Sequence, residues 1–316
     1  MLFKNFKDKL ILVAFIINFC LSQSNKLFNN FNYFEPKSLS MSDLEESILN
    51  SKIQNINLVD YLLSDNKQVI IFGEDHSNVA QKEYFAKILP EIKKKGINVV
   101  ALEMFSEDYQ DILNKYLKGD LSKRNQIDSI LKYFWYEIGK GVVEGYMDIV
   151  DVIKKENMQL IALDVPVNTL LKNLKKEDRL KLNEVWADKI EKYVKTSGEG
   201  LVIYCGFGHL CENSLVNILT KRNVPAIDVM FCGGDLPKDF KLDRFGRIVY
   251  VKTLYTFEEM RIITEKIDWI ARNKINKIDT KEFLLKLKPE DASYDNVPNY
   301  FLWIPPSCKS SKYKGE

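Results

Sequence analysis

The sequence predicts an α/β fold: a single three-layer domain with a mainly parallel mixed sheet and helices on both faces. Short apolar runs rich in β-branched residues recur along the chain, and segments with apolar residues at helical spacing separate them. Continuous apolar runs of this kind are typical of strands buried on both faces of a parallel sheet. We expect strands near Val69, Val99, Leu160, Val202 and Ile227.

The first strand–helix–strand unit has the clearest signals. An apolar run over residues 69–72 ends at Gly73, and residues 79–95 then place apolar side chains at roughly helical spacing. Gly96 follows in the position of a glycine at a helix C-terminus, and residues 97–105 form the next apolar run. Residues 79–95 are therefore predicted to form a crossover helix between two parallel strands.

The remaining elements continue this alternation. Further helices and strands are predicted over residues 106–117, 123–133, 142–157, 158–164, 176–196, 201–206, 210–222 and 225–231. A long amphipathic stretch covers residues 257–274, and a shorter one covers 281–287. The last apolar run, residues 300–304, is closed by Pro305 and Pro306, which favours an edge strand.

The composition argues against nucleic acid as a partner. The 46 Lys and Arg residues nearly balance the 44 Asp and Glu residues, so no excess positive field is expected. With 46% hydrophobic residues in 316, the chain can bury a substantial core. We therefore predict a folded globular protein that does not bind nucleic acid.

The N-terminus has the pattern of an export signal. Three lysines in the first nine residues precede an apolar stretch over residues 10–22, which is shorter than a membrane-spanning helix. We expect residues 1–22 to be a signal peptide cleaved near Ser22, with export to the periplasm or cell envelope, or secretion. The alternatives are an uncleaved anchor, a buried N-terminal helix, or a lipid-anchored form through Cys20.

The rest of the chain is divided by composition. We expect a lead-in segment over residues 23–52, the α/β domain over residues 53–306, and a disordered basic tail over residues 307–316. The exported chain would keep cysteines whose pairing the sequence leaves open, as buried free thiols or as disulfides. They are Cys205, Cys211, Cys232 and Cys308.

The only two histidines of the chain follow predicted strands in the same way. His76 ends the motif Gly-Glu-Asp-His over residues 73–76, and His209 ends Gly-Phe-Gly-His over residues 206–209. Open α/β sheets bind their ligands outside the carboxyl ends of the strands. The repeated Gly-x-x-His pattern therefore indicates a functional site at that edge of the sheet.

Carboxylates are predicted at the same edge. Glu74 ends the first strand, Glu103 the second and Asp164 the third. Imidazole nitrogens and carboxylate oxygens are ligands of divalent transition metals, so His76, Glu103 and His209 are the predicted metal ligands. Glu74 would act as the general base, or the two glutamates would exchange roles. The structural alternative is hydrogen-bonded core histidines with helix-capping acids.

An aromatic segment lies between two predicted helices. Residues 132–136 read Lys-Tyr-Phe-Trp-Tyr, and such clusters usually pack in a core. The tyrosines of this region could also line a pocket for a flat ligand. Tyr133, Tyr136 and Tyr146 are the candidate cofactor-binding residues.

Together, these motifs resemble a known family. The two Gly-x-x-His motifs, Leu-Glu-Met-Phe over residues 102–105 and Tyr-Phe-Leu-Trp-Ile over residues 300–304 resemble the ChaN-like haem-binding proteins of the Tiki/TraB superfamily. This superfamily is similar to erythromycin-esterase-type enzymes. The resemblance covers roughly residues 68–305. It implies a single mixed α/β domain in which Glu74, His76, Glu103 and His209 converge.

Two functions of different classes follow from the resemblance. The first is a cell-envelope protein that binds haem or iron for uptake, with a tyrosine as the iron ligand. The alternative is a metal-dependent hydrolase, a protease or esterase, that acts on a small molecule or peptide. A binding or structural relic of the fold is a third reading. Export and the lipid-anchor alternative also allow peripheral membrane association.

Overall fold

The structure is a computed structural model that describes most of the α/β region. The predicted signal peptide (residues 1–22) and basic tail (residues 307–316) lie outside the described residues, as does nearly all of the lead-in segment. The described residues are Ser42, Glu45, Glu46, Ile48, 58–63, 69–135, 139–167, 176–211, 214–234, 241–242, 248–249, Thr264, 266–271, 283–285 and 299–305.

The five predicted strands all form and lie in one sheet. In the described part of the chain, the sheet order is β3-β2-β4-β1-β5-β9-β8. The strands from β3 to β9 in this order are parallel, and β8 alone runs antiparallel to β9. The α/β fold with a mainly parallel mixed sheet is confirmed. The predicted strands are β1 Val69–Glu74, β2 Val99–Ser106, β3 Gln159–Asp164, β4 Leu201–Gly206 and β5 Ala226–Gly233.

The C-terminal strands differ from expectation. The apolar run predicted as an edge strand is β9 (Tyr300–Ile304), which lies between β5 and β8 and is buried along its whole length. The edge is β8 (Phe283–Leu285), within the stretch that we had interpreted as amphipathic. Because β8 covers one side of β9, the Tyr-Phe-Leu-Trp-Ile run is a central strand. A separate antiparallel pair joins β6 (Lys241–Leu242) to β7 (Ile248–Val249).

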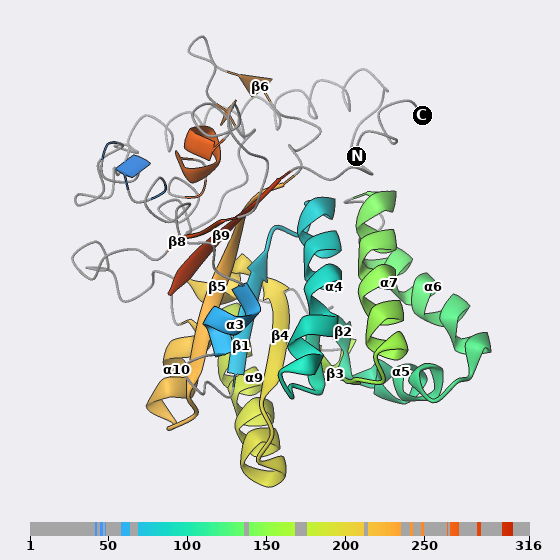
Figure 1. Cartoon of the computed structure of the whole chain (residues 1–316). Coiled ribbons are helices and arrows are strands. Elements are labelled where there is room, and N and C mark those ends of the chain that lie inside the picture. The colour runs from blue at the N-terminus through green and yellow to red at the C-terminus, as the bar shows by residue number, and fades with distance from the viewer. Residues whose placement is uncertain are drawn as a thin grey trace, which may run out of the picture. The chain divides into compact units, whose positions relative to one another are not determined.

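Helices cover both faces of the sheet, and Figure 1 shows α4 and α7 side by side on one of them. Ile70 and Phe72 of β1 pack into the apolar layer on that face, whereas Val69 and Ile71 pack into the layer under α9 and α10. Each such buried side chain contributes about 1.5–3 kcal/mol. The first layer contains α3 Leu58–Leu63, α4 Val79–Lys94, α5 Gln110–Leu117, α6 Arg124–Trp135 and α7 Lys140–Lys155, and the second contains α9 Lys176–Ser197 and α10 Leu215–Lys221.

Two helices begin later than predicted, because a 3-10 turn precedes each of them and a serine caps the start of η1 and of α10. Ser106 accepts a hydrogen bond from the Asp108 amide and begins the 3-10 turn η1 (Glu107–Tyr109) before α5. Ser214 accepts from the Asn217 amide and begins α10, after the separate 3-10 turn η3 (Phe207–Leu210) that carries His209. A serine at an N-cap satisfies an amide that the helix leaves free. A further 3-10 turn, η2 (Leu121–Lys123), precedes α6.

The described residues hold no helix that is both long and apolar enough to cross a membrane. Cys205, Cys211 and Cys232 are buried free thiols, which was one of the two alternatives for these residues. Burial raises the pKa of the Cys211 thiol to about 12. Thiols of this kind are protonated and behave as small apolar side chains.

Asp228 is a carboxylic acid buried in the middle of β5. One of its oxygens, Oδ1, accepts from the Asn299 amide, while Oδ2 has no hydrogen-bond partner in the described part of the chain. Burial raises the pKa of Asp228 from its ordinary value of 3.8 to about 7. The folded protein therefore binds this proton more tightly than the unfolded chain does.

We predict that Asp228→Asn changes how stability depends on pH. Between about pH 4 and pH 7 the folded wild type binds more protons than the unfolded chain, so its free energy of unfolding falls as the pH rises. The variant lacks this group and should gain at least about 1 kcal/mol relative to wild type between pH 5 and pH 8. Urea unfolding measures the difference. Asp111→Asn, at an exposed acid, should show no such gain, and a constant Asp228→Asn difference contradicts the prediction.

Candidate functional site

The structure brings the four predicted site residues together at the carboxyl edge of three neighbouring strands, β2, β4 and β1. Glu74 is the last residue of β1, and His76 lies in the turn that follows. Glu103 lies in β2 just after its last pairing with β4, where the register also shifts against β3. His209 lies in η3, directly after β4. Their roles in catalysis or binding remain predictions.

Glu74 is fully buried, and each oxygen of its carboxylate has two polar neighbours. Oε1 accepts from the Tyr146 hydroxyl at 2.6 Å and lies 3.1 Å from His76 Nδ1. Oε2 accepts from Lys82 Nζ at 2.7 Å and from the Tyr204 hydroxyl at 2.6 Å. Burial opposes ionisation, but the Lys82 ammonium and His76 outweigh it and lower the pKa of Glu74. A carboxylate so engaged holds the turn that carries His76, and the general-base role of Glu74 stays a prediction.

Lys82 is the residue that the sequence reasoning missed. Its side chain is fully buried, and Nζ donates to Glu74, to the His76 carbonyl at 2.8 Å and to the Asn78 carbonyl at 3.3 Å. The ammonium thus binds both the carboxylate and the turn that carries His76. A signal was present, because Lys82 shares a helix face with Phe85 and Leu89, a face that helical spacing assigns to the core.

A close helix contact makes room for this lysine. A Cβ at Gly145 of α7 would lie 2.9 Å from the Cβ and Cδ atoms of Lys82, which is closer than carbon atoms pack. The absence of a side chain at Gly145 therefore lets α7 approach α4, and the Lys82 ammonium lies 4.5 Å from the centre of the Tyr146 ring. This distance allows a cation–π contact inside the protein.

Glu103 lies between the two histidines. Its Oε1 is 3.2 Å from His209 Nε2, while Oε2 accepts from the Gly206 amide and is 3.9 Å from His76 Nε2. Burial opposes ionisation, yet the two histidines and this amide lower the pKa of Glu103 to about 2. Gly206 is required for packing, since a Cβ there would lie 2.5 Å from His76 Nε2. Glu103 is therefore an ionised carboxylate at neutral pH, with one oxygen toward each imidazole.

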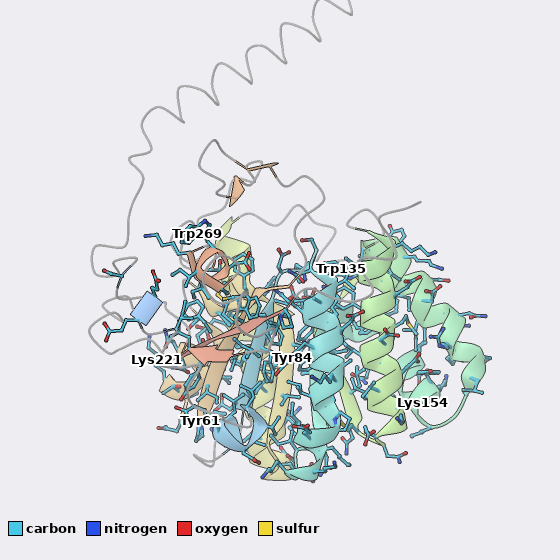
Figure 2. The ribbon with its side chains drawn as sticks, turned by 45° about the horizontal axis from the view of Figure 1, so that its top comes forward. Tyr61, Tyr84, Trp135, Lys154, Lys221 and Trp269 are labelled. Carbon is cyan, nitrogen blue, oxygen red and sulfur yellow. The ribbon has the colours of Figure 1, made fainter. Side chains whose placement is uncertain are left out.

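His76 has the greatest exposure of the charged site residues. Its side chain is 29% exposed, against 14% for Glu103 and 16% for His209. Burial lowers the pKa of His76, but Glu103 and Glu74 outweigh that effect and raise it. The centre of the Trp135 ring lies 4.7 Å from that of the imidazole. Figure 2 labels this tryptophan near the N-terminal end of α4, which follows the turn that carries His76. Its buried indole N–H has no hydrogen-bond partner among the described residues, so a donor is available to a ligand.

His209 is held by α9 as well as by Glu103. Its Nδ1 lies 2.6 Å from Asn183 Oδ1, and its ring stacks on Trp186 with 4.0 Å between centroids. Neither residue was predicted to belong to the site. No spacing rule links α9 to η3, so only their packing reveals this contact.

Asp164 ends β3 beside the site, as the sequence predicted. Burial and the nearby Glu103 charge raise the pKa of Asp164 to about 6. One carboxylate oxygen accepts from the Val165 amide, and the Lys189 ammonium donates to the carbonyls of Leu163 and Asp164. The edge of the sheet therefore carries a third acid that is partly protonated near neutral pH.

The three candidate tyrosines lie in different environments. Tyr133 is 73% exposed at the end of α6. Tyr146 is buried, donates to Glu74, and has a pKa well above its ordinary value because of burial and the Glu74 charge. Tyr136 lies outside the described residues. Tyr146 is thus part of the structural network around Glu74, which argues against it as an iron ligand.

The geometry gives no support to the predicted metal set. In the ranges that the structure describes, no group of three or more His, Cys, Asp or Glu side chains is arranged to hold a metal ion. Glu103 instead has one oxygen 3.2 Å from His209 Nε2 and the other 3.9 Å from His76 Nε2. This arrangement is suited to moving protons between a carboxylate and two imidazoles.

Comparison with family models identifies the segment that contains most of this site. Residues 63–185 match the model described as haem-binding uptake, Tiki superfamily, ChaN. This segment of the chain is therefore similar to the ChaN-like proteins of the Tiki superfamily. The matched ChaN-like segment includes Glu74, His76 and Glu103 but ends before His209. The resemblance predicted from the motifs is confirmed over this range.

Solved structures with detectable similarity are distant. The structure titled cofacial heme binding to ChaN of Campylobacter jejuni is 17% identical, with a TM-score of 0.39 over 59% of this chain and 90% of that one. The type III effector HopBA1 is 14% identical, with a TM-score of 0.43 over 58% and 87%. The C-terminal region of Pasteurella multocida toxin is 11% identical, with a TM-score of 0.43 over 67% and 29%. A search of curated protein sequences finds no match.

We predict that Lys82→Met lowers the free energy of unfolding by about 3–5 kcal/mol, because it leaves the Glu74 carboxylate buried without its cation. Denaturant unfolding measures this loss. Lys87→Met is the matched control, since Lys87 is an exposed lysine of the same helix, and it should cost less than about 1 kcal/mol. Equal losses in the two variants would show that the buried ion pair does not stabilise the fold.

Proposed function

We propose that this protein binds haem. The observation that carries the proposal is the match of residues 63–185 to the haem-binding ChaN model. Aromatic residues next to the site support it, because flat ligands bind against aromatic rings. Phe134 lies 4.9 Å from the Tyr133 ring and 6.4 Å from the Tyr109 ring, and Trp135 lies against His76.

Tyr133 is the tyrosine whose surroundings best suit an iron ligand. Phenolate is a known haem ligand, and a ligand must be reachable by a group as large as a porphyrin. Tyr133 is exposed at the end of α6, whereas the hydroxyl of Tyr146 is buried and donates to Glu74. Releasing Tyr146 would leave that carboxylate without one of its donors, which costs about 1–3 kcal/mol.

We expect Tyr133→Phe to weaken haem binding at least about tenfold, a loss of ~1.4 kcal/mol. Titration of the purified protein with haem, followed by its visible absorbance, gives the affinity. Tyr146→Phe is the control and should keep the affinity of the wild type, since the removed hydroxyl faces Glu74. Retained binding in Tyr133→Phe together with loss in Tyr146→Phe would reverse this assignment.

A role in haem or iron uptake at the cell envelope is part of the proposal. It is supported by the match to a family described as haem-binding uptake and by the first 22 residues, which have the pattern of an export signal. Peripheral membrane association would follow from an anchored N-terminus. We predict that the producing cell removes about the first 22 residues, and mass spectrometry of the native N-terminus tests this. An intact Met1 on the mature protein contradicts export by cleavage.

Hydrolysis is a second candidate function, favoured by one specific observation. The two oxygens of an ionised Glu103 face His76 and His209, one toward each imidazole. One imidazole could take a proton from water while the other donates a proton to the leaving group, as in general acid–base catalysis. Within the described ranges no set of side chains is arranged to hold a metal ion, and this candidate assigns the acid–base roles to the protein's own side chains.

Glu103→Gln should reduce hydrolysis of a chromogenic ester by about 10²–10⁴-fold, because the amide cannot hold a negative charge between the imidazoles. Initial rates at neutral pH provide the measurement. Glu107→Gln is the control. Glu107 is a partly exposed acid whose ion-pair partner is Lys189, with 2.7 Å between Nζ and Oε2, and neither histidine takes part in this pair. Equal rates in Glu103→Gln and wild type would exclude the acid–base role of Glu103.

A further inference from the structure

We propose that Asn183 is a positioning residue that holds His209 with its Nδ1 protonated, so that Nε2 is the nitrogen that exchanges protons at the site. The inference rests on the acid–base candidate described above and goes further by assigning which nitrogen acts. It starts from a contact between two elements that are distant in the chain, α9 and η3.

The Asn183 side chain contacts His209 through both ends of its amide. Oδ1 lies 2.6 Å from His209 Nδ1, and Nδ2 donates to the His209 carbonyl at 3.5 Å. The carbonyl accepts only, so the amide must present its NH₂ group to it and its oxygen to the ring. An amide oxygen also accepts only. Nδ1 of His209 therefore carries a hydrogen in this arrangement.

The other ring nitrogen then faces Glu103. His209 Nε2 lies 3.2 Å from Glu103 Oε1, and this carboxylate is ionised because its pKa is about 2. Because Nδ1 donates its hydrogen to Asn183, Nε2 is the ring nitrogen left to exchange protons at the site. That nitrogen points to the same carboxylate that faces His76.

Trp186 fixes the plane of the same ring. It lies one helical turn after Asn183 on α9, and its indole stacks on the imidazole with an angle of 27° between the planes. The indole is fully buried, and its N–H has no hydrogen-bond partner in the described part of the chain. Trp186 therefore acts as an apolar platform, while Asn183 sets the rotation of the ring within that plane.

The two histidines consequently differ in their supporting partner. His76 Nδ1 faces the carboxylate of Glu74, which brings a negative charge, whereas His209 Nδ1 faces a neutral amide. A partner at the second nitrogen sets the tautomer and the basicity of an imidazole. The neutral partner fixes the tautomer of His209 without adding charge, which suits a ring that must release its proton again.

Imidazole ¹⁵N NMR tests this directly, because the full-length chain has only two histidines and needs no substrate for the measurement. In wild type the His209 Nδ1 signal should be that of a protonated nitrogen at neutral pH. Asn183→Leu removes the acceptor, so the signal should shift toward an unprotonated Nδ1. Asn183→Asp keeps an acceptor and should restore the protonated signal, with the His76 signals as an internal control in each variant.

A protonated Nδ1 that persists in a folded Asn183→Leu protein overturns the proposal. If Asn183→Leu does not fold, Asn183→Ala gives the same readout with a smaller side chain, and an unchanged Nδ1 there overturns it equally. Ester hydrolysis provides the second measurement, and its rate should fall at least tenfold in the Leu or Ala variant. Failure of the wild type to hydrolyse esters would remove the proposed function, whereas the NMR result decides the positioning role by itself.

Discussion

The buried ion pair between Glu74 and Lys82 is the interaction on which the site depends. Neither charge could remain inside the protein alone, because an unpaired buried ion is strongly destabilising. The pair is further satisfied by the hydroxyls of Tyr146 and Tyr204 and by the carbonyls of the His76 turn. The end of β1, the start of α4 and the facing turn of α7 are thereby locked together. Glu74 accordingly supports His76, while His76, Glu103 and His209 are the more accessible groups of the site.

Glu103 connects the two halves of the site. One half is built on β1 and α4, and the other on β4, η3 and α9. The Glu103 carboxylate, on β2 next to β4 in the sheet, faces both imidazoles. Each histidine also has its own support: Glu74 and Trp135 for His76, and Asn183 and Trp186 for His209. Pre-organised groups of this kind do not have to be reoriented when a ligand binds. In the haem proposal the ligand contacts Tyr133 and the aromatic residues near His76. In the acid–base proposal the substrate contacts Glu103 and the two histidines.

Much of the fold could be predicted because strands and glycines leave local signals. The β-branched runs predicted the first five strands, and parallel topology then placed Glu74, Glu103 and the two histidines at one edge. The strand role of β9 was recognised, but its position inside the sheet was not, because the segment that forms β8 was interpreted as an amphipathic stretch and not as a strand. Lys82 was not predicted to belong to the site, because no local pattern indicates that a buried carboxylate would neutralise a lysine on the inner face of a helix.

The sequence by itself determined the α/β class, the ChaN-like resemblance and the gathering of acids and histidines at the strand ends, since each follows from local periodicity and strand direction. Only the tertiary structure decided what each residue does there. In the folded protein both oxygens of Glu74 have hydrogen-bond partners, Tyr146 is buried and Tyr133 is exposed. Asn183 and Trp186 of α9 contact His209. The physical reason is that burial and hydrogen-bond partners depend on contacts between distant segments, and these contacts set whether a group is charged, accessible or already engaged.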